Sequence, residues 1–263
     1  MNRHHLLTTS HSPLTTKMLL RPFLLALQLL TCIPTPVRFE PRPEEWGWSA
    51  FYFPLVGLTI GLLLVALNAV LTGADPGVAA ALLLAVWAFT TGGLHLDGLA
   101  DAADAWIGGF GDREKTLNIM RDPRSGPIAI MVITLTLIAK FAALQALLTQ
   151  SAVVAALWLT PVLGRSAILL MLLTTPYVRP QGMGVAHAQY LPRRACGVLL
   201  LAVLAVTLAA LRERAVVLAV LLGLGFLGLR RLLQARLGGT TGDTLGATCE
   251  LAETVTLLAL ALA

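Results

Sequence analysis

Seven long apolar stretches, separated by short polar connections, decide what this chain can fold into. A helix needs about 20 residues to cross the hydrocarbon core of a bilayer, whereas transmembrane strands would appear as short alternating segments. With 57% hydrophobic and only 13% charged residues, the chain is not an ordinary soluble domain, in which roughly 25% of residues are charged. We therefore predict an all-α, polytopic transmembrane helical bundle of about seven spans. These spans are 52–72, 77–96, 126–148, 152–174, 195–211, 215–230 and 244–262.

The residues before the first span need a separate interpretation. Residues 1–17 are polar and are predicted to form a disordered tail, so a start of translation at Met18 is also compatible with the sequence. Residues 18–33 are apolar but too short to span, and prolines follow them, which predicts an interfacial or half-buried helix. Residues 34–50 are expected to be a loop, and residues 18–263 to be a single integral-membrane domain.

The basic residues indicate how the bundle is oriented, because cytoplasmic loops of membrane proteins carry an excess of Lys and Arg. With the N-terminus in the cytoplasm, only Arg212 and Arg214 of the 19 basic residues fall in outer loops, while Lys140 and Arg165 fall inside predicted spans. The net charge of +5 is explained by this asymmetry, and we expect no nucleic-acid partner. The loops with unusual polar chemistry that then lie on the cytoplasmic side are 97–125, 175–194 and 231–243.

Three aspartates, Asp97, Asp101 and Asp104, follow the second apolar stretch at spacings of four and three. On a helix, where each residue turns by about 100°, they fall within an arc of about 60°. Like charges so close repel one another. Mg²⁺ would relieve the repulsion, because it prefers carboxylate oxygens and leaves positions open for phosphate. Small neighbours such as Gly98 and Ala100 leave room for a bulky ligand. Spacing alone leaves open the alternative of a solvated polar helix face.

A second acidic set lies in the segment GGTTGDTLGATCELAE, residues 238–253. Asp243, Glu250 and Glu253 fall within roughly 80° of one another on a helix. Glu250 and Glu253 lie inside a predicted span, where ionisable groups are costly and usually face a bundle interior or a polar cavity. Backbone amides around Gly242, just before a helix N-terminus, would form a phosphate nest, although Gly-rich linkers have the same pattern.

Basic side chains supply a third component of a phosphate site. Arg121 and Arg124 lie in the segment LNIMRDPRSG, and the planar arginine fork suits phosphate oxygens. Arg113 and Lys115, a few residues earlier, are interpreted instead as ordinary loop charge.

Three further residues lie close to or within the spans. Arg165 sits in mid-span, so it requires either a carboxylate of the acidic sets or a substrate phosphate. Lys140 lies similarly deep but is long enough to snorkel. His95 is interpreted as structural, with a role as a base as the alternative. Acids for a metal, a Gly-rich turn and arginines on one membrane face together indicate phosphoryl or nucleotidyl transfer, which depends on positioning and charge neutralisation.

Four motifs in this order resemble the cobalamin-5′-phosphate synthase family, also called adenosylcobinamide-GDP ribazoletransferases. The motifs are TGGLHLDGLADAADA, LNIMRDPRSG, PYVRPQGMG and LGGTTGDTLGATCELAE. The resemblance extends from about residue 20 to the end of the chain. Cys32 stands where the family has Arg, Pro123 where it has Ser, and Ala129 where Gly is common, which weakens the expectation for the 122–129 turn.

The resemblance implies a polytopic enzyme of the bacterial inner membrane, with its active site facing the cytoplasm, that acts late in cobalamin biosynthesis. Such an enzyme joins adenosylcobinamide-GDP to α-ribazole or α-ribazole 5′-phosphate. It releases GMP together with adenosylcobalamin or its 5′-phosphate. The resemblance also implies a requirement for Mg²⁺. A homo-oligomer, or a complex with other enzymes of the pathway, is left open.

The resemblance also implies roles for individual residues. The three aspartates of the first set are expected to be catalytic and, with Asp243, to hold Mg²⁺ across the diphosphate. Asp104 is the carboxylate expected to accept the proton of the attacking hydroxyl, and Glu250 and Glu253 would complete the metal site or orient ribazole. Tyr177 would stack on a ring, or would be a lipid-interface tyrosine. The expected catalytic residues are Asp97, Asp101 and Asp104, and the expected substrate-binding residues are Arg121, Arg124, Arg165, Tyr177, Arg179, Gly242, Asp243, Glu250 and Glu253.

Two other functions compete with this one. A CDP-alcohol phosphotransferase of phospholipid synthesis has Arg where this chain has Asp101, and its further spaced aspartates are missing here. An ion-coupled transporter would place acids near the middle of several spans. In this chain the first acidic set and Asp243 are instead expected at one membrane face.

Overall fold

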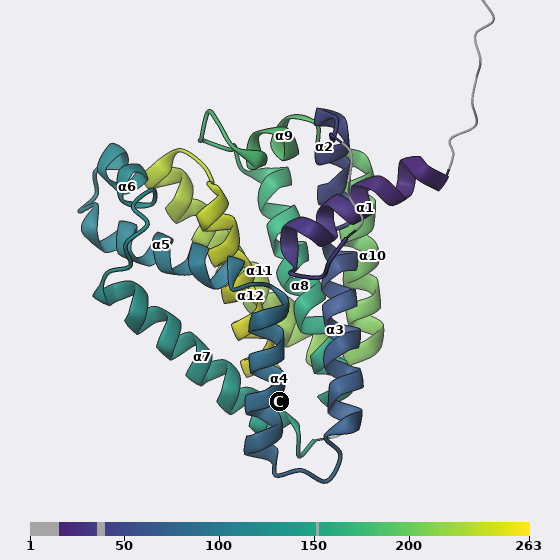
Figure 1. Cartoon of the computed structure of the whole chain (residues 1–263). Helices are drawn as coiled ribbons and strands as arrows, with labels where there is room; N and C mark the ends of the chain where they lie inside the picture. The colour runs from purple at the N-terminus through teal and green to yellow at the C-terminus, as the bar shows by residue number, and fades with distance from the viewer. Residues whose placement is uncertain (1–15, 36–39, 151–152) are drawn as a thin grey trace, which may run out of the picture.

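The computed structural model describes residues 16–35, 40–150 and 153–263, and the regular secondary structure of this part of the chain is α-helical (Figure 1). Its only β-type contact is one isolated parallel bridge between Tyr177 and Thr240. The prediction of an all-α bundle is therefore confirmed. The predicted disordered tail falls almost wholly outside the described residues. The helices are α1 (Thr16–Leu30), α2 (Pro43–Phe51), α3 (Phe53–Val70), α4 (Pro76–Thr90), α5 (Leu94–Gly108), α6 (Arg113–Ile119), α7 (Pro127–Leu147), α8 (Val153–Thr174), α9 (Met183–Gln189), α10 (Arg193–Leu211), α11 (Glu213–Leu237) and α12 (Gly242–Leu262).

Six of these helices are long and apolar enough to cross a membrane, namely α3, α7, α8, α10, α11 and α12. The pair α4 and α5 makes a seventh if it is counted as one bent span. This confirms the expected number of spans, but the prediction of one straight span over 77–96 is wrong. The chain turns by 84° between α4 and α5. Gly92 and Gly93 make the turn with φ of 60° and 69°, in the left-handed region that glycine adopts at little cost.

The N-terminal part of the chain packs on the bundle rather than crossing it. Helix α1 lies across α2 and α3 (Figure 1), with Leu25 and Ala26 buried and Leu20 exposed, as the prediction of a half-buried helix requires. The prediction of a loop over 34–50 is wrong beyond Arg42. Helix α2 begins at Pro43 because proline is pre-organised for the first helical position, and Glu45 accepts a hydrogen bond from the Arg42 amide at 2.8 Å.

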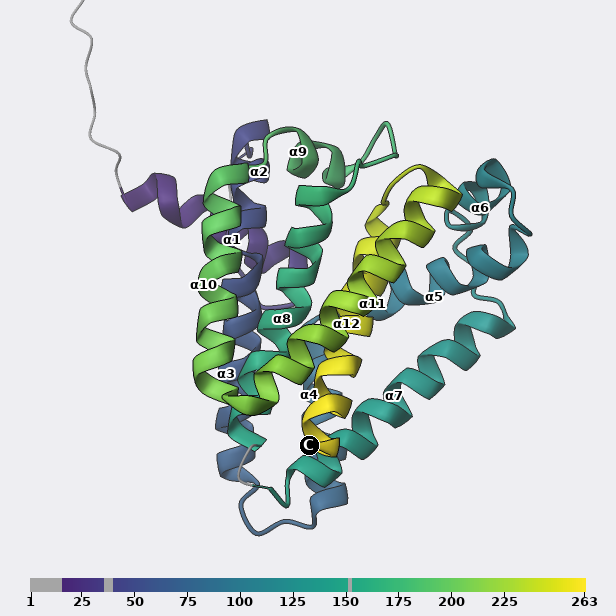
Figure 2. The ribbon, with the colours of Figure 1, turned by 180° about the vertical axis from the view of Figure 1, so that it is seen from behind.

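Helices α3 and α8 form the closest contact of one half of the bundle, where they stand beside α10 (Figures 1 and 2). Gly57 and Gly61 lie one turn apart on α3 and face the α8 backbone. A Cβ atom at Gly57 would lie 2.4 Å from the Pro161 carbonyl oxygen, and one at Gly61 would lie 2.5 Å from Trp158 Cα. This small-residue spacing lets two membrane helices approach backbone to backbone.

Helix α12 is the centre of the other half, where it contacts α5, α7, α8 and α11 (Figure 2). Its crossing with α5 is also close, although less so than the crossing of α3 and α8. A Cβ atom at Gly98 would lie 2.8 Å from the carbonyl oxygen of Asp243, and one at Gly246 would lie 3.2 Å from that of His95. The absence of side chains at both positions therefore sets α5 directly against the first two turns of α12.

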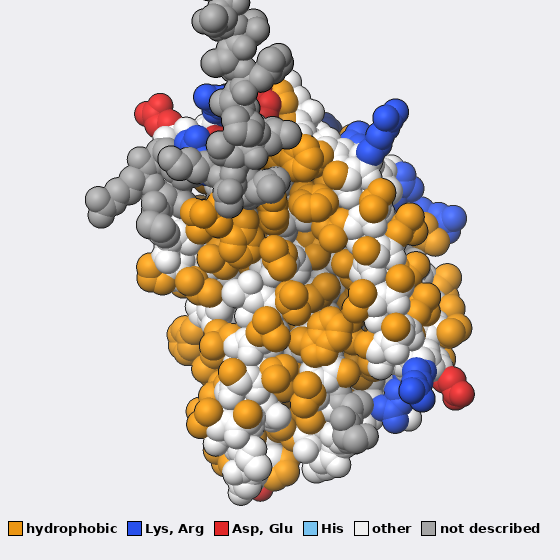
Figure 3. All heavy atoms as spheres, turned by 90° about the vertical axis from the view of Figure 1, so that its right-hand side faces the viewer, with side chains coloured by type: hydrophobic (Ala, Val, Ile, Leu, Met, Phe, Trp, Pro, Cys, Tyr) orange, Lys and Arg blue, Asp and Glu red, His pale blue; other side chains and the backbone are white. Residues whose placement is uncertain are grey.

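The outer surface agrees with a lipid environment. Figure 3 shows a face on which hydrophobic side chains predominate, with Lys, Arg, Asp and Glu toward its upper part and its lower edge. Helices α10 and α11 expose large apolar side chains such as Val198, Leu201, Val216 and Leu224. Water would oppose so much exposed apolar area, so the chain is a polytopic membrane protein.

The α5–α12 crossing predicts opposite effects for two Gly→Ala substitutions. Gly98→Ala is expected to lower the free energy of unfolding by about 1–3 kcal/mol, because the new methyl group collides with backbone. Gly225→Ala is the matched control in α11. It has nothing within 4 Å of the new Cβ, so it should be neutral or stabilise by about 0.5–1 kcal/mol. Thermal unfolding in detergent, followed by tryptophan fluorescence, measures both. A rise in midpoint for both variants would contradict the close crossing.

Candidate active site

The three aspartates of the first set lie along one face of α5, as the sequence predicts, and this face runs beside the first turn of α12. Asp97 is exposed, whereas Asp101 and Asp104 are partly buried. Partial burial, together with the charges of Asp97, Asp243 and Asp104, raises the pKa of Asp101 from 3.8 to about 6. The charges of four carboxylates from two helices therefore interact at this face. Helix α5 is not one of the six spanning helices.

These carboxylates fit a hard divalent cation by the type of donor, since Mg²⁺ takes carboxylate oxygens. Their mutual repulsion, expressed in the pKa of Asp101, also favours a bound cation. The side chains do not converge on one point, however. Over residues 16–35, 40–150 and 153–263, no three His, Cys, Asp or Glu side chains are arranged to hold a metal ion. Because Asp97 and Asp104 are seven residues apart, they lie about 10 Å apart along the helix axis.

Asp104 has a structural role that the sequence did not indicate. Its two carboxylate oxygens accept hydrogen bonds from the backbone amides of Gly126 and Ala129, at 2.5 and 2.9 Å. These amides belong to the first turn of α7, whose own N-cap residue, Gly126, has no side chain. Asp104 therefore caps α7 from a neighbouring helix and ties the turn before α7 to α5.

The segment between α8 and α9, residues 175–182, completes the acidic face and is called the strap below. The Val178 amide donates to Thr240 O at 2.9 Å, and the Thr240 amide donates to Pro176 O at 2.8 Å. The strap thereby holds Arg179 next to α12, where its Nη2 donates to Asp243 Oδ2 at 2.5 Å. The Arg179 Nε atom is buried without a hydrogen-bond partner in the described part of the chain. Arg179 is thus the cation paired with the acidic face.

The strap also brings Tyr177 to the start of α12. Tyr177 is partly buried against Gly184, and this burial raises the pKa of its hydroxyl. Helix α12 begins at Gly242, which is exposed, and Thr241 caps it by accepting from the Thr244 amide at 3.2 Å. The predicted helix N-terminus at Gly242 is therefore present, with Tyr177, Arg179 and Asp243 around it.

Two of the other predicted arginines, Arg121 and Arg124, lie in the turn that Asp104 holds. Arg124 is exposed and donates to Asp122 at 2.7 and 2.9 Å, and these bonds lower the pKa of Asp122 to about 2. Arg121 is also exposed and makes no ion pair with the described residues.

Arg113, interpreted above as ordinary loop charge, instead donates from Nε to the Leu237 carbonyl at the end of α11, at 2.8 Å.

Glu250 and Glu253 lie on the same α12 face as Asp243 but about 10 and 15 Å further along the axis, where they are 5% and 1% exposed. Lys140 Nζ donates to both carboxylates, at 2.5 and 2.6 Å. Arg165 pairs with Glu253, so its partner is a carboxylate of the acidic sets. Lys140 is 3% exposed, which corrects the expectation that it snorkels. The sequence already indicated that Lys140 would be buried and paired, because two buried acids need two buried cations.

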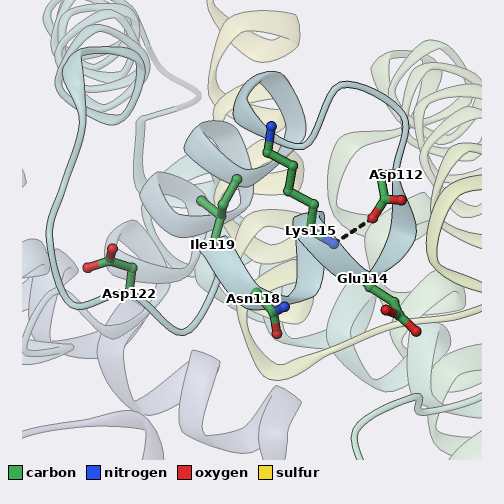
Figure 4. Close-up of a pocket in the computed structure, with 6 residues that line it drawn as sticks. All are labelled: Asp112, Glu114, Lys115, Asn118, Ile119 and Asp122. Atoms are coloured by element: carbon green, nitrogen blue, oxygen red, sulfur yellow. Dashed lines mark hydrogen bonds between the residues drawn. The ribbon is translucent and has the colours of Figure 1, made fainter.

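A surface hollow beside α6 is separate from this group of residues. It is lined by Ile119 and by polar side chains of α6 and its flanking turns (Figure 4). Lys115 N donates there to Asp112, the N-cap of α6, at 2.7 Å. None of the predicted site residues lines it. We therefore place the candidate site on the acidic face of α5 and the N-terminus of α12, not in this hollow.

The cap formed by Asp104 predicts a local loosening when it is removed. Asp104→Ala is expected to cost about 1–2 kcal/mol of stability and to speed trypsin cleavage after Arg121 and Arg124. Asp75→Ala is the matched control, because Asp75 caps α4 through the amides of Gly77 and Val78. It should lower the unfolding midpoint similarly without exposing the 121–124 turn. Equal cleavage rates in both variants would contradict the role of Asp104.

The raised pKa of Asp101 predicts a pH-dependent stability difference. The folded state binds the Asp101 proton more tightly than the unfolded chain does, so this group favours folding below about pH 4 and loses that contribution as pH rises toward about 6. Asp101→Asn should therefore raise the unfolding midpoint at pH 8 in metal-free buffer, and the gain should disappear near pH 4. A gain that is equal at both pH values would show that ionisation of the partly buried Asp101 carboxyl is not its cause.

Comparison with known proteins agrees with the motifs. A family model described as cobalamin-5-phosphate synthase matches residues 22–261. An adenosylcobinamide-GDP ribazoletransferase of Pseudomonas fluorescens Pf-5 is 54% identical over 244 residues, which cover 92% of this chain and 99% of the relative. Relatives of the same name from Pseudomonas putida W619 and Stutzerimonas stutzeri A1501 are 52% and 51% identical, over 92% of this chain and 99% and 98% of theirs. No solved structure gives a significant match. The chain therefore belongs to the cobalamin-5-phosphate synthase family.

Proposed function

We propose that this protein is an adenosylcobinamide-GDP ribazoletransferase. It joins adenosylcobinamide-GDP to α-ribazole or α-ribazole 5′-phosphate and releases GMP. The observation that carries the proposal is the α5–α12 crossing, which sets the acidic face of α5 beside Asp243 and Arg179. Curated relatives that bear this name, matched over nearly their whole length, support it.

In the proposed reaction, the ribazole 3′-hydroxyl attacks the phosphate attached to cobinamide. A new P–O bond forms, the diphosphate P–O bond breaks, and GMP leaves while the hydroxyl proton passes to a base. Asp97, Asp101 and Asp243 are the residues that would hold Mg²⁺. A bound Mg²⁺ would polarise the phosphoryl group and neutralise charge on the leaving GMP. Asp104 is included neither in this set nor as the base, in contrast to the expectation from the sequence, because both of its oxygens already accept hydrogen bonds from backbone amides.

Arg179 and the N-terminus of α12 are proposed to bind the diphosphate. Arginine binds phosphate oxygens as a planar fork, and a helix N-terminus favours anions. In this proposal Arg179 leaves Asp243 when the diphosphate arrives, which frees the Asp243 carboxylate for the cation. Tyr177 lies close enough to Gly242 to stack against a substrate ring. Arg121 and Arg124 are exposed in the turn that Asp104 ties to α5, and they are proposed to contact phosphate from there.

The proposed location is the bacterial inner membrane, with the site on the cytoplasmic side, because the basic residues concentrate in loops on that side. No observation favours the alternatives. The charged residues that a transporter would need inside the membrane are here paired with one another and buried. The family match also gives no support to a CDP-alcohol phosphotransferase.

The proposal is tested with protein in lipid nanodiscs, adenosylcobinamide-GDP, α-ribazole and Mg²⁺, by chromatography of GMP and the corrinoid product. The wild type should release GMP only when both substrates and Mg²⁺ are present. Asp101→Asn should lower the rate by about 100-fold or more, since it removes one charge from the cation site. Glu114→Gln, an equivalent change in the hollow beside α6, should keep the wild-type rate. No GMP from folded protein in lipid would refute the proposed function.

A further inference from the structure

A neutral cluster of charged side chains lies in the interior of the bundle, beyond the acidic face. It contains two cations, Lys140 of α7 and Arg165 of α8, and two anions, Glu250 and Glu253 of α12, all at most 5% exposed. Lys140 bridges the two glutamates and also lies 4.9 Å from the centre of the Trp87 ring of α4. The cluster therefore joins four helices through side chains that water does not reach.

One contact extends this cluster to α5. Arg165 Nη2 lies 3.3 Å from His95 Nδ1. Because arginine is always a donor, Nδ1 accepts this bond and the ring proton is on Nε2. His95 is 2% exposed, and its Nε2 atom has no hydrogen-bond partner in the described part of the chain. The orientation of the His95 ring thus depends on Arg165.

The position of His95 connects this contact to the candidate site. His95 precedes Asp97 by two residues, and its carbonyl oxygen is the atom that a Cβ at Gly246 would meet. On the other side, Gly164 lets α8 approach α12, since a Cβ there would lie 2.7 Å from Glu253 Cγ. Arg165, the next residue, is thereby held between Glu253 and His95. Helix α5 is therefore held against α12 by backbone contact and to α8 by one hydrogen bond, while Asp104, further along the helix, ties it to α7.

We propose that Arg165, Glu253 and His95 are positioning residues for the reaction: they set the rotation of α5 about its axis, and so the direction in which Asp97 and Asp101 face Asp243. Lys140 and Glu250 balance the charge of the cluster, and their hydrogen bonds in the described part of the chain do not go to α5. The proposal rests on the proposed function for its turnover measurements. It also gives Arg165 and Glu253, which the sequence suggested as substrate-binding residues, a role away from the substrate. Glu250, suggested in the same way, is buried and bonded to Lys140, so it is assigned no contact with the substrate.

Two charge-balanced double variants separate positioning from stability. Arg165→Met with Glu253→Gln leaves the Lys140–Glu250 pair intact and removes the donor to His95. Lys140→Met with Glu250→Gln leaves the Arg165–Glu253 pair and the His95 contact intact. Each removes one cation and one anion, so both should unfold close to the wild-type midpoint. Arg165→Met alone leaves an excess buried carboxylate and should unfold about 10 °C lower.

Turnover should distinguish the two double variants. The Arg165/Glu253 double variant is expected to lose about ten- to a hundredfold in kcat with little change in the KM for α-ribazole, because misoriented catalytic groups slow chemistry more than they weaken binding. The Lys140/Glu250 double variant should keep most of the wild-type kcat. Equal kcat values in the two double variants, whether both high or both low, would overturn the positioning role.

Substitutions of His95 keep the proposal falsifiable if a double variant fails to fold. His95→Asn retains an acceptor near the Nδ1 position and should preserve more activity than His95→Leu, which retains none. Loss of activity to the same extent in both would contradict the inference. The stabilisation of the protein by Mg²⁺ alone, measured as a rise in unfolding midpoint, should fall in His95→Leu relative to His95→Asn. This readout needs no turnover, so it tests the inference independently of the proposed function. Failure of the proposed function would show itself differently, because the wild type itself would then release no GMP.

Discussion

The close approach of α5 to α12 is the contact on which the candidate site depends. Gly98 and Gly246 have no side chains to keep the two backbones apart, so the acidic face of α5 lies beside the first turns of α12. The strap at Tyr177 and Thr240 then adds Arg179 to the same place. Residues from three distant parts of the chain meet because two helices can touch backbone to backbone.

Charge is arranged differently on the two sides of this contact. In the bundle interior two cations and two anions neutralise one another, as a low-dielectric environment requires. At the start of α12, carboxylates outnumber cations, and Arg179 is paired with only one of them. Such an imbalance is tolerable where water and substrate have access, and it leaves Asp97 and Asp101 available to a cation. The balanced cluster stabilises the bundle, and the unbalanced group is suited to chemistry.

Sequence reasoning succeeded where one helix decided the outcome and failed where a second helix was needed. The aspartate spacing correctly placed three carboxylates on one face of α5. The same reasoning grouped Asp243 with Glu250 and Glu253, which share a helix face but differ in depth by two to three turns. Asp104 also shares its face with Asp97 and Asp101, yet α7 uses it as a cap. Periodicity reports direction around a helix and says nothing about which neighbour stands there.

By itself the sequence determined that this chain is a bundle of membrane-spanning helices, because runs of about 20 apolar residues have no other stable environment. It also determined the family, through four motifs and through a match over nearly the full length of known relatives. Only the tertiary structure decided which charges are paired in the interior and which face the candidate site. That division depends on the depth of each side chain and on the helix opposite it, and contacts between residues 110 positions apart, such as Lys140 with Glu250, leave no local pattern in the chain.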